Sequence, residues 1–229
     1  MGDQGQTQQA QQIDKKAILA VIKAVAKNNS FVIRFGDIED ELAGMVEDEE
    51  EFDRLREELL YSSPERLKYI YYIYENERES WFDRVVVSPI ELNESQLKTL
   101  SEVAGLLDYG FSRDEYENRN IDEVITKVIN GLVRKWSMTC TEDSTPALAV
   151  YRIAKAYNLD VQVVDEHPAS LGSGGSITYS IEGIIKVTKW YWYCNDCIIP
   201  AGNNFIEKCS TWEFEDNSEQ NTTEVSGYD

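Results

Sequence analysis

The stretch Ile177-Thr-Tyr-Ser-Ile-Glu-Gly-Ile-Ile-Lys-Val-Thr-Lys-Trp-Tyr-Trp-Tyr193 decides the fold class of this chain. β-Branched and aromatic residues dominate it, which is typical of strands rather than helices. Glu182-Gly183 interrupts the run where a tight turn would reverse the chain and pair its two halves. The alternation of an extended chain puts Trp190 and Trp192 on one face and the neighbouring tyrosines on the other. We therefore predict a small antiparallel, aromatic-rich sheet here.

The sequence on either side of this stretch sets the boundaries of the sheet. A glycine-rich loop, Gly172-Ser-Gly-Gly175, precedes it, and a further β-rich run extends from Phe205 to Phe214. Both ends of the chain are polar and poor in apolar residues, which favours flexible tails. We divide the chain into a disordered tail (1–12), a mainly helical α+β region (13–168), a β-meander packed on the same core (169–214) and a second disordered tail (215–229).

The region before the sheet carries mostly helical signals. Apolar residues recur at helical spacing, and Asp, Asn or Thr-Pro precede several of these segments as start signals. Short β-branched runs at 30–35, 85–87 and 161–164 indicate strands, the first ending at Gly36 and the last buried. The helices are predicted over 14–28, 46–60, 64–79, 93–107, 121–136 and 146–158. The predicted fold class is α+β, with one or two strands among the helices and the small sheet at the end.

The charge of the chain limits the partners it can bind. It carries 22 Lys and Arg against 42 Asp and Glu, a net charge of −20. Nucleic acid binding draws its affinity from basic side chains that displace counterions, and the chain has no basic cluster to supply it. We therefore expect that the chain does not bind nucleic acid directly. Solubility alone is one explanation of the acidity, and attraction to a basic protein partner is the other.

Half of this charge lies in one segment. Residues 37–58 contain twelve acidic residues and two arginines. With the acidic helix over 46–60, the adjacent 64–79 helix forms a predicted hairpin. The second helix is apolar nearly all round, so it is either central in the fold or docked against a partner. We predict an acidic interaction protein for a basic partner, in one version a nucleic-acid-mimicking inhibitor from a virus or mobile element. The predicted interaction residues are Glu47, Asp48, Glu49, Glu50, Glu51, Asp53, Tyr69 and Tyr72.

The cysteines provide a candidate zinc site. Cys194-Asn-Asp-Cys197 places two thiols at a spacing that can bind one tetrahedral ion, and Cys209 follows as a third candidate ligand. Cys140 or His167 would have to supply the fourth. Free thiols and a disulfide are the alternatives. If zinc is bound, the chain is a zinc-stabilised regulatory or accessory protein.

A hydrolase is the opposing class of function. Asp165-Glu-His167 follows a predicted strand, where a carboxylate could orient the imidazole as a base, although a solvated turn before Pro168 is the simpler interpretation. Cys140, the helix after it and the strand Asp-Val-Gln-Val-Val164 distantly resemble the core of transglutaminase-like cysteine hydrolases. That family has a histidine on the next strand, and residues 177–181 have none. The resemblance implies Cys140 as nucleophile only if His167 substitutes; a metal-dependent hydrolase is the other form of this hypothesis.

The chain lacks the signals for membrane insertion or export. No run of about 18 uncharged apolar residues occurs, and the polar residues 1–12 lack the apolar segment of a secretory signal. We expect a cytoplasmic protein that does not bind a membrane.

Overall fold

The computed structural model describes residues 13–63, 66–74, 84–108, 120–133, 145–170, 174–192 and 209–215. Helices and strands alternate in the first part, and a strand-rich part ends the chain, so the α+β prediction is confirmed. In chain order the elements are α1 (Lys15–Asn28), β1 (Val32–Arg34), α2 (Phe35–Ala43), α3 (Glu49–Leu60), β2 (Ile70–Tyr74), β3 (Arg84–Val87), α4 (Glu94–Asp108), α6 (Asn120–Val133), α7 (Pro146–Ala156), β4 (Val161–His167), β5 (Gly175–Ile181), β6 (Ile185–Trp192) and β7 (Cys209–Phe214).

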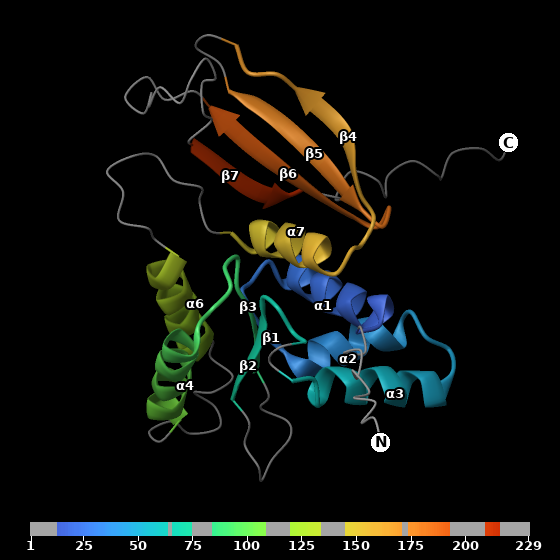
Figure 1. Ribbon diagram of the computed structural model, residues 1–229, viewed down its shortest axis with the longest axis vertical. Helices are drawn as coiled ribbons and strands as arrows, with labels where there is room; N and C mark the ends of the chain where they lie inside the picture. The colour runs from blue at the N-terminus through green and yellow to red at the C-terminus, as the bar shows by residue number, and fades with distance from the viewer. Residues whose placement is uncertain are drawn as a thin grey trace, which may run out of the picture.

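Two antiparallel sheets lie on opposite sides of α7 (Figure 1). The first has the order β1-β3-β2, and the second has the order β4-β5-β6-β7. Helix α7 contacts β6 and β7 on one side and α1 and β3 on the other. Five residues of α7 are fully or almost fully buried because both of its sides meet other elements: Ala147, Ala149, Val150, Ile153 and Ala154. The core is therefore continuous from the first sheet to the second.

Helix α1 forms where the sequence predicts it. The side chain of Asp14 caps its first turn by accepting the backbone N–H of Lys16 at 2.9 Å. Asn29 ends the helix in the left-handed conformation that asparagine tolerates well. The Ala, Ile and Val residues between them are buried, so a cap at each end and an apolar stripe were sufficient signals.

The predicted helix over 64–79 is wrong, because its central part is strand β2. Ile70 pairs with Val87 and Tyr72 with Val85 in an antiparallel register. Consecutive residues such as Ile70 and Tyr71 are both buried, so β2 reads as an unbroken apolar run that also fits helical spacing. Aromatic and β-branched residues favour strands, and pairing with β3 decided between the two. The predicted helical hairpin is therefore absent.

Strand β4 is longer and more exposed than the sequence indicates. Within the described strands it pairs with β5 alone and forms an edge of the second sheet. Val163 and Val164 are 56% and 50% exposed, so the prediction of a buried strand is wrong. A register shift between Val163 and Asp165, together with the charged residues that follow, protects such an edge from pairing with another chain.

The sequence predicts the turn between β5 and β6 correctly but places the end of β1 too late in the chain. The β5–β6 hairpin turns at Glu182-Gly183 as predicted, and both residues have positive φ, as a type I′ turn requires. The predicted strand over 30–35 ends earlier, because Phe35 and Gly36 already belong to α2. The carboxylate of Asp37 accepts the backbone N–H of Arg34 at 3.0 Å and starts that helix.

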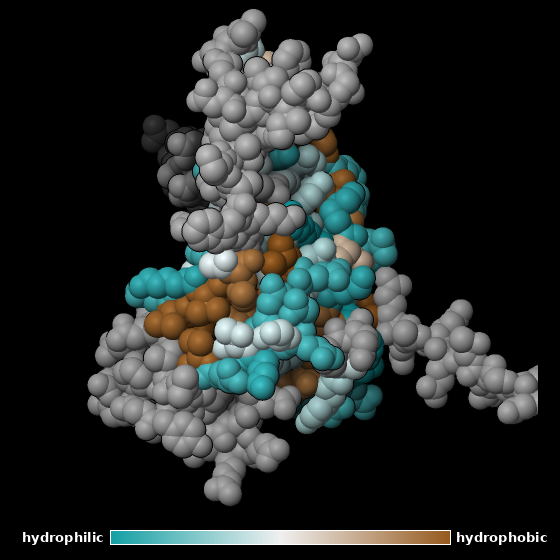
Figure 2. All heavy atoms as spheres, turned by 60° about the vertical axis from the view of Figure 1, so that its left-hand side comes forward, coloured by the Kyte–Doolittle hydropathy of each residue, from teal (hydrophilic) through white to brown (hydrophobic). Residues whose placement is uncertain are grey.

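The acidic composition does not make the surface uniformly hydrophilic. Figure 2 brings forward the side of the molecule that carries α4 and α6 in Figure 1, and hydrophobic residues interrupt the hydrophilic ones across its middle. In the part of the chain that the structure describes, no helix is both long and apolar enough to cross a bilayer.

Candidate interaction surfaces

The acidic segment folds as α2, a short link and α3, and its carboxylates fall into two sets. The half-buried carboxylates are all ion-paired, most of them with a residue on α1, α2 or α3 and Asp37 with Arg34 at the start of its own helix. The pairs are Lys23 and Lys27 with Glu41 (2.9 and 3.1 Å), Arg34 with Asp37 (3.6 Å), Lys16 with Glu51 (2.8 Å), Arg54 and Arg66 with Glu58 (3.7 and 3.0 Å), and Arg56 with Glu39. These acids hold the helices together.

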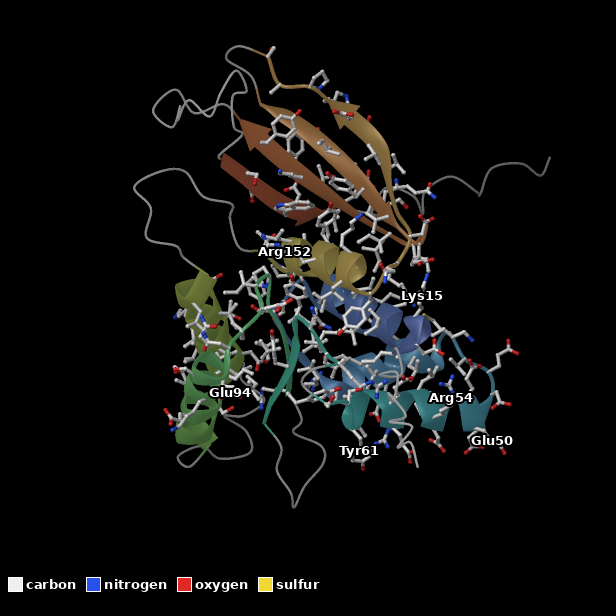
Figure 3. All side chains as sticks on the ribbon, in the orientation of Figure 1. Lys15, Glu50, Arg54, Tyr61, Glu94 and Arg152 are labelled. Carbon is white, nitrogen blue, oxygen red and sulfur yellow. The ribbon has the colours of Figure 1, made fainter. Side chains whose placement is uncertain are left out.

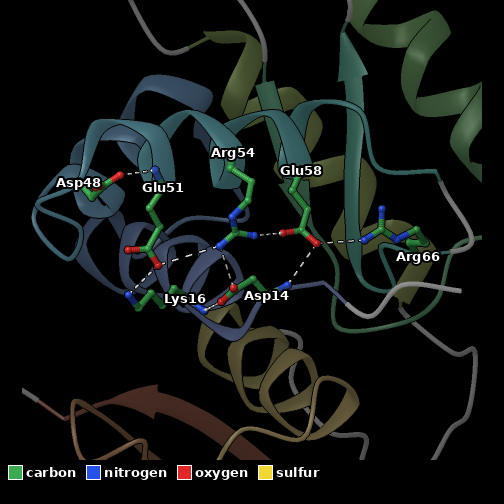
Figure 4. Close-up of polar contacts among 7 residues, drawn as sticks. All are labelled: Asp14, Lys16, Asp48, Glu51, Arg54, Glu58 and Arg66. Carbon is green, nitrogen blue, oxygen red and sulfur yellow. Dashed lines mark hydrogen bonds and ion pairs between the residues drawn. The ribbon is translucent and has the colours of Figure 1, made fainter.

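Glu58 is the centre of the inward-facing network (Figure 4). Its carboxylate accepts the backbone N–H of Asp14 at 3.3 Å and a guanidinium N–H of Arg66 at 3.0 Å. Arg54 lies between Glu58 and the side chain of Asp14, which accepts its N–H at 3.2 Å. These contacts join the start of α1, α3 and the segment before β2, so this group of charges stabilises the fold.

Glu41 is held ionised by two of the lysines of α1, Lys23 and Lys27. Burial raises the pKa of Glu41, but hydrogen bonds and charges from Lys23 and Lys27 outweigh it and lower the pKa overall. The hydrogen bond to Glu41 in turn raises the pKa of Lys27. The carboxylate stays charged and belongs to the α1–α2 contact.

The exposed carboxylates form the second set. Asp48 accepts the backbone N–H of Glu51 at 2.8 Å and caps α3. Among the described residues, none of this set forms an ion pair within the chain. The exposed set is Asp40, Glu47, Asp48, Glu49, Glu50, Asp53 and Glu57.

Three of the exposed acids and one tyrosine share a face of α3. Glu50, Asp53, Glu57 and Tyr61 are separated by three or four residues, the spacing that places helix side chains on one side. Tyr61 caps the helix end and is 81% exposed. Figure 3 shows Glu50 and Tyr61 at opposite ends of α3, pointing away from the body of the molecule. We call these four residues the α3 ridge.

The predicted interaction tyrosines lie elsewhere. Tyr69 and Tyr72 are half-buried against the core at and before β2. The Tyr72 hydroxyl donates to the backbone oxygen of Leu59 at 2.7 Å, which ties β2 to the end of α3. Sequence reasoning missed Tyr61, although its position four residues after Glu57 was a signal that continued the helical stripe.

The predicted zinc ligands are mostly outside the described residues. Cys194, Cys197 and Cys140 all fall there, and Cys209 is the first residue of β7. No three His, Cys, Asp or Glu residues are grouped for metal binding in the described ranges. The zinc site and the Cys140–His167 hydrolase stay predictions.

His167 and Asp165 lie on the exposed strand β4. Nδ1 of His167 is 3.2 Å from the Asp165 carboxylate. Because the two residues are two positions apart on one strand, their side chains share a face of the sheet. Both line a hollow of about 570 Å³ on the second sheet. Thr178, Thr188, Trp190 and other polar residues complete this hollow. Sequence reasoning found the Asp–His pair but not its neighbours, since strand pairing brings them together.

Gly175 lines this hollow at a point where three strands approach each other closely. A Cβ on Gly175 would lie 2.6 Å from the Tyr191 ring and 2.7 Å from the backbone oxygen of His167. Real Cβ contacts are longer, so only glycine lets β4, β5 and β6 approach this closely.

Comparison of the chain with known protein families, with curated proteins and with solved structures gave no significant match. The class of molecule is therefore defined by its own fold and surfaces, as an acidic α+β protein whose α3 ridge carboxylates form no ion pair among the described residues.

Proposed function

We propose that this chain is a non-enzymatic interaction protein of the cytoplasm that binds a basic protein partner through the α3 ridge. The observation that carries the proposal is the division of the acids into two sets. Carboxylates that face inward form ion pairs within the chain, whereas among the described residues those that face outward on α3 form none, although the charge of Asp53 adds to the hydrogen bond with Glu39 in raising the pKa of Arg56. Solubility needs no such alignment along one helix face.

The ridge combines the two features that a basic partner needs. Three carboxylates in line along α3 would steer a positively charged surface during encounter. Tyr61 adds a large exposed ring at the end of the line, and tyrosine is enriched among the residues that dominate binding energy. A protein surface that otherwise binds nucleic acid has this chemistry, so inhibition of such a partner is the version of the function that we favour.

Part of the acidic segment is explained by the stability of α3 itself. Glu49, Glu50 and Glu51 occupy the first turn of α3, where negative charge is favourable near the helix N-terminus. This reason does not apply to Asp53 and Glu57, which lie further along the helix. The proposal therefore rests on the ridge as a whole and not on the glutamate run.

The test places a photo-crosslinker on the ridge. The variant Tyr61→p-benzoylphenylalanine is expressed in its native host, irradiated, and its adducts are identified by mass spectrometry. A second protein also carries three neutralising changes on the ridge, and a matched control carries three on α4 and α6. The ridge changes are Glu50→Gln, Asp53→Asn and Glu57→Gln. The control changes are Glu94→Gln, Glu102→Gln and Glu123→Gln.

We expect an adduct with a basic protein whose yield falls at least about fivefold in the ridge variant and with added salt, but stays unchanged in the control. Equal loss in both variants would mean that only net charge matters. Either that result or the absence of any adduct at low salt overturns the proposal.

A further inference from the structure

The second sheet carries a hollow, lined by both polar and aromatic side chains, on the face that points away from α7. In an antiparallel sheet, directly paired residues point to the same face. Tyr179, paired with Val187, packs its ring against that of Tyr151 of α7 and so marks the inner face. Thr178 and Thr188, paired with each other, therefore point outward.

The same alternation brings the rest of the hollow together. Asp165 pairs with Thr178, and Glu213 of β7 pairs with Thr188. Trp190 lies two residues beyond Thr188 on the same face, and its ring is 43% exposed. Residues from all four strands therefore surround a hollow of about 570 Å³, which is large enough for a small organic group.

The floor of the hollow offers hydrogen-bond acceptors. Thr178 and Thr188 are each 8% exposed, and their hydroxyls are 2.9 Å apart. Each hydroxyl has two lone pairs, and the bond between them uses only one of the four. The remaining lone pairs can accept N–H groups from a ligand.

The walls add negative charge beside an aromatic face. Glu213 accepts the indole N–H of Trp190, which occupies that donor and holds the carboxylate beside the ring. Asp165 and Glu215 also line the hollow. The Asp165 carboxylate lies 3.2 Å from Nδ1 of His167, and Lys186 forms a 3.0 Å ion pair with Glu215. The lining therefore favours a cation with several N–H donors, and disfavours an anion.

The acids do not converge as metal ligands do. Among the described residues, no three His, Cys, Asp or Glu side chains are grouped closely enough to hold a metal ion. They lie around an open hollow with a tryptophan ring on one side, an arrangement that suits an extended organic cation.

We propose that this hollow binds a guanidinium or alkylammonium group, with the cation against Trp190 and Glu213 and the N–H groups directed to the threonine floor. The group is either a side chain of a peptide or a free amine. This site is separate from the α3 ridge and does not depend on the function proposed for it.

The test uses defined probes and full-length protein. Binding of the capped tripeptide Gly-Arg-Gly and of free agmatine is measured by NMR titration of the tryptophan indole N–H signals. The signal of Trp190 is assigned with the variant Trp190→Phe. The neutral tripeptide Gly-citrulline-Gly has nearly the same shape as the arginine peptide and is the ligand control.

Two variants test the location of the site. Glu213→Gln removes a charge that lines the hollow. Glu166→Gln removes the same charge from β4, next to the hollow but paired with Ile177 and so on the other face of the sheet. Circular dichroism checks that both variants keep the fold.

We expect saturable binding of at least one cationic probe that shifts the Trp190 signal, weakened about tenfold by Glu213→Gln and unchanged by Glu166→Gln. The tighter of the two cationic probes identifies the source of the group. Three results overturn the proposal: no saturable shift of the Trp190 signal with either cation, equal binding of the citrulline peptide, or equal weakening by both variants.

Discussion

Glu50 and Glu51 are neighbours in the chain with identical side chains, yet the helix separates their roles. Glu51 turns toward α1 and forms an ion pair with Lys16 at 2.8 Å. Glu50 points away from the molecule and forms no ion pair among the described residues. A rotation of about 100° per residue along a helix is the physical reason. The acidic count of a segment therefore says little about its function until the face of each residue is known.

Tyr157 joins the end of α7 to the segment that precedes β2. Its hydroxyl accepts the backbone N–H of Lys68 at 2.7 Å and donates to the backbone oxygen of Arg66 at 2.8 Å. Burial raises the pKa of Tyr157 to about 12. The side chain is 7% exposed, so neither backbone group would readily find water in its place.

We predict that Tyr157→Phe lowers the free energy of unfolding by about 1 to 3 kcal/mol at neutral pH, because two backbone groups lose their partner. The raised folded-state pKa means that the protonated phenol stabilises the fold fully below pH 10. This contribution disappears as the pH rises from about 10 to about 12. Urea denaturation across this range should show a shallower pH dependence in the variant than in the wild type.

The matched control is Tyr61→Phe, which changes an exposed ring and should leave both stability and pH dependence unaltered. Burial also raises the pKa of Tyr71. The wild type and the Tyr157→Phe variant should therefore both lose some stability at high pH. Identical slopes for wild type and Tyr157→Phe would contradict the assignment.

At the scale of elements, the N-terminus of α3 is capped within the chain, and the outer face of the helix is exposed to solvent. Asp48 accepts the N–H of Glu51 at 2.8 Å, while Glu50, Asp53 and Glu57 make no such contact among the described residues. Stability and binding should therefore separate on this helix. We expect the Asp48 cap to contribute to stability and the α3 ridge to contribute to binding.

We predict that Asp48→Ala lowers the free energy of unfolding by about 1 kcal/mol, because α3 loses its N-cap. Glu47→Ala, one residue earlier and outside the cap, is the control with the same loss of charge and should change stability by less than half as much. Chemical denaturation measures both. Equal effects of the two substitutions would show that charge, and not capping, determines the result.

Elements with local signals were predictable, and those fixed by distant partners were not. Helix α1 has a cap at each end, α7 has Thr145-Pro146 at its start, and the β5–β6 hairpin has Glu182-Gly183 at its turn. Strand β2 lacks such a signal. Its apolar run fits a helix or a strand, and pairing with β3, a separate segment of the chain, made it a strand.

At the scale of the whole molecule, α7 joins the two sheets into one core. Ile153 is completely buried in α7, which contacts β3 on one side and β6 and β7 on the other. The rings of Tyr151 and Trp212 pack against each other across the second of these contacts, with centroids 4.6 Å apart. Damage to this helix should therefore reach both sheets.

We predict that Ile153→Ala lowers the free energy of unfolding by about 2 to 5 kcal/mol through the cavity it leaves. Hydrogen exchange should become faster in peptides from β3 and from β5–β6 to a similar extent, because the two sheets share one core. Lys155→Ala, at an exposed position of the same helix, is the control and should change neither. Faster exchange in one sheet alone would contradict a single cooperative core.

The sequence by itself determined the α+β class, the charge, the capped helices and the C-terminal hairpin, because each depends on residues close together in the chain. Tertiary structure alone decided that β2 is a strand, that β4 is an exposed edge, and which carboxylates remain unpaired. It also assembled the hollow around Trp190 from four strands. Burial and ion pairing depend on which distant segments meet, and this information is not contained in local spacing.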